Sequence, residues 1–246
     1  MRDDLDRDAG YQFAYTRGAL SLPGFRPFDG MDDLDRLYRS DSLFPLVLNR
    51  LLPPSRPEYE PFLRWNGFDP ETPPEPLLLL ERAGGGKATD SIELFPRPIP
   101  GVDGCYQNYF FIHGMRYQMG GEAARSAVEQ LRDGDRLELT PEPTNPIDPA
   151  AVAIRSGGSM LGYAPRYLAR DFGVLLRNCP AETIRLWAHR INPDAPFQQR
   201  VLCRFTACWP EGFEPHQGEE FEPLVAVEPL PQPHTAAAMS TPSTSL

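Results

Sequence analysis

The chain has 246 residues, of which 41% are hydrophobic and 24% charged, so it can form one large or two small domains with real cores, which excludes a peptide or a fibre. Its 29 prolines are about twice the usual share, and its net charge of -10 argues against a protein coated for nucleic acid. No eighteen consecutive residues are apolar and the first six are too acidic for a signal peptide, so we expect a cytoplasmic protein without membrane contact, with four reduced cysteines.

Short helices separated by proline corners are predicted for the first hundred residues. Pro45 suits the first turn of a helix, and Gly67 is a typical helix stop. A glycine triplet between two apolar runs indicates a tight turn from a helix end into a strand. The predicted helices cover residues 41–52 and 57–65 and a third ends at 77–80, and the predicted strand covers residues 91–96.

Prolines and glycines between residues 96 and 104 predict a domain boundary. We therefore expect a Pro-rich mixed α/β segment over residues 1–102, a second domain over 103–209 and a tail over 210–246. The tail has six acidic and no basic side chains, and its last residues are small and polar. It buries too little apolar surface to offset its ordering entropy, so we predict disorder from about Pro229.

The second domain is predicted to contain short strands and two helices. Residues 136–140 alternate at period two, as in a half-buried strand, and Ser156-Gly157-Gly158 is a hairpin signal. An α+β fold follows, with a small OB-like β-barrel whose closure removes exposed strand edges. The predicted strands cover residues 109–113, 136–140, 150–154, 160–163, 183–191 and 200–209, and the predicted helices cover 122–132 and 166–177.

The charge of the chain is distributed unevenly. Residues 103–208 hold 12 basic and 11 acidic side chains, so this is the only part that is not acidic, and all 12 of its bases are arginine. Arginine forms bidentate contacts with phosphate and stacks on rings. The whole chain has a single lysine, Lys87, so a compositional bias explains the arginine count as well.

Residues 145–152, NPIDPAAV, form the most informative stretch. Prolines on both sides of the Ile147-Asp148 pair restrict the backbone, so the Asp148 carboxylate is fixed in place. A fixed carboxylate is a good acceptor for a hydroxyl donor such as the 3'-hydroxyl of a nucleic-acid strand. The alternative is that Asn145 and Asp148 only cap a turn through their own backbone.

Two further stretches contain residue types that bind nucleic acid. At the end of the predicted strand 109–113, Arg116 and Tyr117 offer a cation for phosphate and a ring on which a base stacks, or else a packed ring beside a solvated charge. The sequence Tyr163-Ala164-Pro165-Arg166 leads from a strand into a helix. Amides at that helix start favour an anion, with Arg166 beside them, and the alternative is an ordinary helix start.

In this order, these stretches resemble the HIRAN domain, a small module of helicase-like DNA repair proteins that also occurs alone in bacteria. The resemblance covers residues 103–208 and implies an OB-like barrel that binds a free 3' end of single-stranded DNA. It implies that Arg116 and Tyr117 contact the terminal nucleotide and Asp148 its 3'-hydroxyl. Where helicase-linked members carry a stacking aromatic, this chain has Ile147, and Tyr163 offers a substitute ring. The stretches are GMRY (114–117), LRDGD (131–135), NPIDPAAV (145–152) and LGYAP (161–165).

The upstream segment, over residues 11–100, has a fainter resemblance to the N-terminal subdomain of the HipA kinase family. In that family the subdomain contacts partners and does not transfer phosphate. The resemblance therefore implies a protein partner for this segment. It rests on residues 13–15 (FAY), 21–23 (SLP), 49–53 (NRLLP) and 84–86 (GGG), together with Phe44.

No catalytic constellation is evident, and we expect neither a cofactor nor a metal. Residues 81–88 lack the first glycine and the final Ser or Thr of a phosphate loop. The candidates for zinc are Cys179, Cys203 and Cys208 with His189 and His216, and their spacing matches no common structural zinc site. We therefore predict a non-enzymatic module that binds single-stranded DNA ends in DNA repair or genome and mobile-element maintenance. The alternatives are a regulatory adaptor without DNA binding and, by association with helicase-fused relatives, a zinc- or nucleotide-dependent hydrolase.

Overall fold

A computed structural model describes residues 10–86, 90, 92–118 and 121–227, which fall into two compact units. In the described part of the chain, the smaller unit combines residues 10–44 with 218–227, and the larger lies within Pro45–Gln217. The expected junction at residues 96–104 lies inside the larger unit, in irregular chain that ends in a turn just before β3 (Cys105–Phe111). The disorder predicted from Pro229 concerns residues outside the described ranges.

The smaller unit contains a two-stranded antiparallel sheet over a cluster of aromatic rings. Strand β1 (Tyr11–Phe13) pairs with β2 (Tyr38–Ser40), and the short helix α1 covers Arg17–Ser21. The rings of Phe13, Tyr15, Phe25, Phe28, Tyr38 and Phe44 contact one another.

Part of the predicted tail completes this smaller unit. The amide of Leu224 donates to the Tyr15 carbonyl (2.8 Å), and that of Arg17 donates to the Glu222 carbonyl (2.8 Å). A 3-10 turn, η2, covers Glu219–Phe221 within this segment. These hydrogen bonds order part of the acidic tail, which its composition did not predict.

The larger unit begins with three helices, α2 (Pro45–Leu48), α3 (Tyr59–Trp65) and α4 (Pro76–Ala83). Proline stands in the first turn of α4, and Gly84 ends it with a left-handed φ of 76°. The first predicted helix is shorter than expected because it stops at Leu48. The predicted strand at 91–96 is wrong for its described residues 92–96, which form no ladder.

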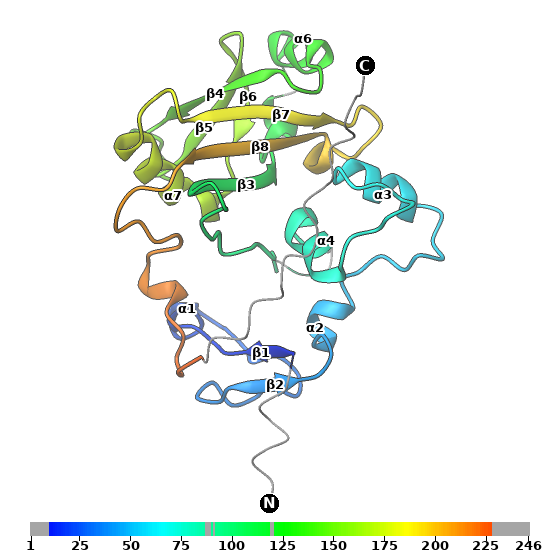
Figure 1. Cartoon of the computed structure of the whole chain (residues 1–246), viewed down its shortest axis with the longest axis vertical. Coiled ribbons are helices and arrows are strands. Elements are labelled where there is room, and N and C mark those ends of the chain that lie inside the picture. The colour runs from blue at the N-terminus through cyan, green and yellow to red at the C-terminus, as the bar shows by residue number, and fades with distance from the viewer. Residues whose placement is uncertain (1–9, 87–89, 91, 119–120, 228–246) are drawn as a thin grey trace, which may run out of the picture. The chain divides into compact units, whose positions relative to one another are not determined.

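Six strands then form one antiparallel sheet in the order β3-β8-β7-β4-β5-β6 (Figure 1). Two residues beyond the end of β3, His113 exchanges backbone hydrogen bonds of 2.9 Å each with Tyr163 of the other edge strand, β6. The predicted OB-like α+β fold is confirmed, but the sheet is not closed into a barrel by a ladder: among the described residues an isolated bridge joins its edges. The strands are β3 (Cys105–Phe111), β4 (Arg136–Pro141), β5 (Val152–Ser156), β6 (Ser159–Tyr163), β7 (Arg185–Ile191) and β8 (Val201–Cys208).

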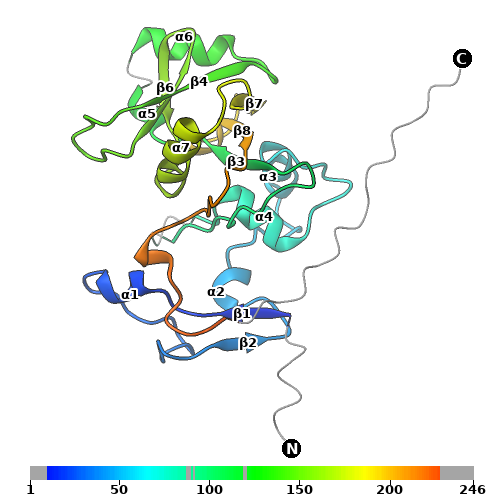
Figure 2. The same cartoon turned by 60° about the vertical axis from the view of Figure 1, so that its left-hand side comes forward.

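Two longer helices cover the sheet: α6 (Glu122–Gln130) and α7 (Arg166–Asn178), as predicted (Figure 2). The α7 face that carries Leu168, Phe172 and Leu175 is fully buried against the strands. Phe172 is 4.2 Å from the Phe205 ring, measured between centroids. Two short helical turns, α5 (Met115–Gln118) and η1 (Phe197–Gln199), were not predicted.

After β8, residues 209–217 complete the larger unit and pack against α7, where the His216 amide donates to Asp171. Phe213 is buried and contacts Tyr106 and Trp209, whose indole donates to the Phe213 carbonyl (3.1 Å). Within the described residues, no helix has the length and apolarity needed to cross a membrane.

Candidate functional site

The loop between β4 and β5 is shaped by two side chains that bind its own backbone. Oδ1 of Asn145 accepts hydrogen bonds from the amides of Ile147 (3.0 Å) and Asp148 (3.2 Å). Oδ1 of Asp148 accepts one from the amide of Ala150 (2.9 Å). Both residues therefore cap a turn, as the alternative interpretation held. A carboxylate has about four acceptor positions, so this bond leaves Asp148 able to bind a further donor.

Arg116 and Tyr117 lie on α5 and not at the end of a strand as predicted. The chain leaves β3 at Phe111 and turns at Gly114, whose left-handed φ of 73° favours glycine. The Arg116 guanidinium donates to the Tyr117 hydroxyl and lies 4.6 Å from the ring centroid. Tyr117 is 71% exposed, so one face of its ring is open to a ligand.

Tyr163, at the end of β6, is held by a carboxylate that sequence reasoning missed. Its hydroxyl donates to Oε2 of Glu142 (3.1 Å), which also accepts from Nδ2 of Asn145 (3.1 Å). The Asn145 amide lies 3.4 Å from the Tyr163 hydroxyl as well. Burial raises the pKa of Tyr163, and the Glu142 carboxylate raises it further. Tyr163 thus stays a neutral, oriented ring.

Arg166 is the first residue of α7, and its side chain is 82% exposed. Nε lies 3.4 Å from Oδ2 of Asp148, whose side chain is 23% exposed. Exposed ion pairs contribute about 0 to 1 kcal/mol, so this pair is easily rearranged by a ligand. A cation and an acceptor therefore lie side by side at the helix start.

A cavity of about 480 Å³ brings five of the six predicted site residues together: Tyr117, Asn145, Asp148, Tyr163 and Arg166. We call it the end cavity. Arg116 is not in its wall and reaches it only through Tyr117. A ring, a cation, a fixed carboxylate and an amide in one hollow provide contacts for a base, a phosphate and a hydroxyl.

The end cavity also contains residues that the sequence did not single out as ligands. His113 forms part of its wall beside the bridge to Tyr163, and burial lowers the pKa of its imidazole, which favours the neutral ring. Ile147 is 87% exposed on the same wall, an unusual place for a large apolar side chain. Only spatial proximity identifies His113 and Glu142, since neither belongs to a recognisable local pattern.

All four cysteines lie in the part of the chain that the structure describes. There, no group of three or more His, Cys, Asp or Glu side chains is arranged to hold a metal ion. Cys179 instead donates to the Cys208 carbonyl (3.2 Å), and burial raises the pKa of the Cys179 thiol to about 12. Cys203 is fully buried, and this raises its pKa too.

Comparisons with known proteins identify the domain that carries this cavity. The family model of the HIRAN domain matches residues 106–208, in agreement with the resemblance of residues 103–208. The crystal structure of the HIRAN domain of human HLTF is 16% identical to this chain and has a TM-score of 0.32. The match covers 44% of this chain and 81% of the HLTF domain's chain. A crystal structure of a protein from Lactobacillus plantarum is 19% identical to this chain and has a TM-score of 0.33. The match covers 42% of this chain and 97% of that protein's chain. No curated protein matches the chain significantly. The upstream resemblance to the HipA family stays a prediction.

Proposed function

Residues 106–208 form a HIRAN domain, and from this we propose that the protein binds single-stranded DNA and holds its free 3' end in the end cavity. The family match supports a nucleic-acid-binding module. The observation that carries the finer proposal is the meeting of Tyr117, Asp148 and Arg166 in a hollow of about 480 Å³.

Each of these groups has a distinct part in the proposed complex. The open ring of Tyr117, with Arg116 against it, stacks on the terminal base, a contact worth about 1 to 3 kcal/mol. Arg166 binds the adjacent phosphate, and Asp148 accepts the 3'-hydroxyl proton. Ile147 adds an apolar contact where a stacking ring is absent.

The proposed role is binding without a chemical step, in DNA repair or in genome and mobile-element maintenance in the cytoplasm. The carboxylate next to the cation supports a hydroxyl end over a phosphate end, since Asp148 repels an anion placed against it. The module thus recognises the end of a strand and not only its backbone.

A titration by fluorescence anisotropy tests the proposal, with DNA strands labelled at the 5' end. The strands end in a 3'-hydroxyl, a 3'-phosphate or a 3'-deoxy sugar, and a circular strand has no end. We expect the 3'-hydroxyl strand to bind at least tenfold more tightly than the other three, because a hydrogen bond to a charged group contributes about 1.5 to 3 kcal/mol. In Asp148→Asn the preference over the 3'-phosphate should be lost.

Asp69→Asn is the matched control, since Oδ1 of Asp69 accepts a hydrogen bond from the Glu71 amide (3.0 Å) just as Asp148 binds its own loop. This control should retain the preference of the unmodified chain. Equal binding of 3'-hydroxyl and 3'-phosphate ends by the unmodified protein would overturn the role of Asp148. Absence of any DNA binding would favour the regulatory adaptor.

A further inference from the structure

A second cavity, of about 740 Å³, lies along α7 next to the end cavity. The two cavities share Ala151 and Ala169 in their walls, so they are adjoining hollows on the same helix. We call the second one the α7 groove. Nothing in the proposed contacts of the terminal nucleotide makes use of it.

A stripe of arginines runs along α7 from one cavity to the other. Arg166 belongs to the end cavity, and Arg170 and Arg177 belong to the α7 groove. All three are exposed. Residues 166 and 177 are eleven positions apart, close to three full turns, so the stripe stays on one side of the helix over about 16 Å. The Arg177 guanidinium folds back toward Gly173, where an added Cβ would lie 3.3 Å from Nη1.

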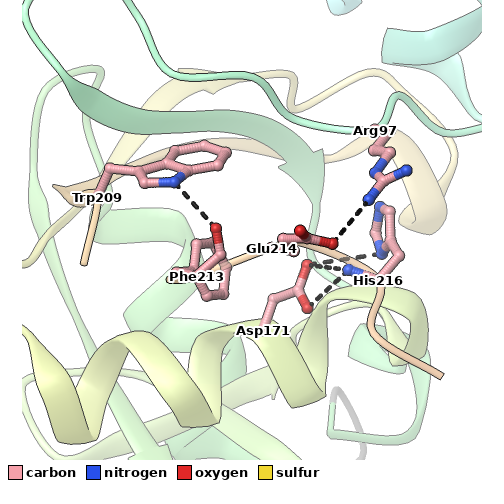
Figure 3. Close-up of polar contacts among 6 residues, drawn as sticks. All are labelled: Arg97, Asp171, Trp209, Phe213, Glu214 and His216. Carbon is pink, nitrogen blue, oxygen red and sulfur yellow. Dashed lines mark hydrogen bonds and ion pairs between the residues drawn. The ribbon is translucent and has the colours of Figure 1, made fainter. Parts of the chain in front are cut away.

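The opposite wall of the groove is apolar. Three prolines and Val152 come from the end of β4, the loop that carries Asp148 and the start of β5. Phe213 closes the wall from the segment after β8. Figure 3 shows how that segment is held against α7, since both oxygens of Asp171 accept from the His216 amide (3.1 and 3.2 Å). The prolines are Pro141, Pro143 and Pro149.

The acidic groups of the groove are already paired. Asp171 is buried, binds the His216 amide and lies 3.5 Å from Nδ1 of the same residue. Glu214 lies 3.6 Å from the Arg97 guanidinium (Figure 3). The groove therefore presents positive charge above an apolar wall in a chain whose net charge is -10.

We propose that the α7 groove binds the part of the same single strand that lies upstream of its 3' end. Arg170 and Arg177 contact successive stretches of the phosphate backbone, and the exposed prolines of the wall contact the bases. Single-stranded nucleic acid is bound in positively charged grooves that follow its backbone, and an apolar wall offers its bases a surface to pack on. The inference rests on the proposed function, because the end cavity fixes which end of the strand enters first.

The groove sets a measurable site size. At about 3.4 Å per stacked nucleotide, a stripe of about 16 Å spans about five nucleotides. Affinity for 3'-hydroxyl strands should therefore rise as the strand lengthens from two to about six nucleotides and then level off. In the double variant Arg170→Gln/Arg177→Gln this rise should disappear, while the affinity for the dinucleotide stays within twofold.

Salt dependence supplies a second readout of the same variant. Each phosphate contact in a single strand contributes about 0.7 to the slope of log affinity against log salt, so two lost contacts lower it by about 1.4. Between 50 and 200 mM salt, the unmodified protein should lose about sevenfold more affinity for a hexanucleotide than the variant. Arg64→Gln/Arg136→Gln, which removes two exposed arginines outside both cavities, is the charge-matched control and should behave like the unmodified protein.

Gly173→Leu obstructs the groove without changing charge, and it replaces a helical glycine by a good helix former. It should also abolish the gain from strand length. If the unmodified protein binds the dinucleotide but gains no affinity with longer strands, the groove proposal is wrong and the proposed role of the end cavity is unaffected. The same holds if both groove variants still gain affinity as the strand lengthens. If the dinucleotide does not bind the unmodified protein, the proposed function itself fails.

Discussion

Asp148 illustrates how far a single residue can be interpreted before its surroundings are known. The flanking prolines correctly predicted a fixed carboxylate, and the turn-capping bond to Ala150 is present. The neighbour that makes it a candidate ligand, Arg166, is 18 positions away and is brought within 3.4 Å only by the fold. The sequence pattern thus identified the residue, and the tertiary structure provided its partner.

His189 carries a pH dependence that can be measured. Burial lowers the pKa of its imidazole, and Arg82 and Arg204 lower it further, against a smaller opposite effect of Asp133. Because the folded pKa lies below the unfolded one, the unfolded state binds more protons, so the free energy of unfolding falls as pH drops through about 6.5. Urea unfolding at pH 8 and 5.5 should show a larger loss in the unmodified protein than in His189→Gln. An identical loss in both would contradict this role.

At the scale of elements, strands and long helices followed local patterning and short elements did not. The period-two pattern of β4 and the apolar face of α7 were correctly predicted, because each buries one face in the core. Helix α5 was missed, since four residues give no periodicity to detect. Its Arg116 and Tyr117 were therefore identified but assigned to the wrong element.

The junction of the two edge strands depends on Gly162. A Cβ there would lie 2.4 Å from the His113 carbonyl oxygen and 2.6 Å from Cγ2 of Ile112. We predict that Gly162→Ala lowers the free energy of unfolding by about 2 to 4 kcal/mol and weakens DNA binding, because His113 and Tyr163 both form the end cavity. Denaturant titration measures the loss. Gly86→Ala, where a Cβ meets nothing within 4 Å, should be nearly neutral, and equal stability of both variants would refute the packing argument.

At the scale of the whole molecule, the described chain divides at residues 44/45 and 217/218, and the HIRAN match covers only part of the larger unit. Phe213 and His216 lie beyond that match, yet Phe213 belongs to the core and His216 binds Asp171 of α7. Local composition could not reveal this, because an acidic proline-rich stretch looks the same whether or not it finds a surface to pack on.

Two truncations test this division. Residues 45–217 should unfold cooperatively and retain the binding of 3'-hydroxyl strands. Residues 45–209 should be less stable by about 3 kcal/mol or more, because Phe213 leaves a cavity and Asp171 loses the His216 amide. Chemical denaturation compares the two fragments. If the shorter one is as stable as the longer, the segment after β8 is not part of the folded core.

The sequence by itself determined the HIRAN resemblance, the six strands of the larger unit, its longer helices and the six candidate ligands, because those features depend on period, turn residues and short motifs. Only the tertiary structure decided that five of the six residues share one cavity, that Glu142 orients Tyr163, and that the arginines of α7 lead away from that cavity. These properties depend on distances between residues far apart in the chain, and such distances exist only after the sheet has curled and its edges have met.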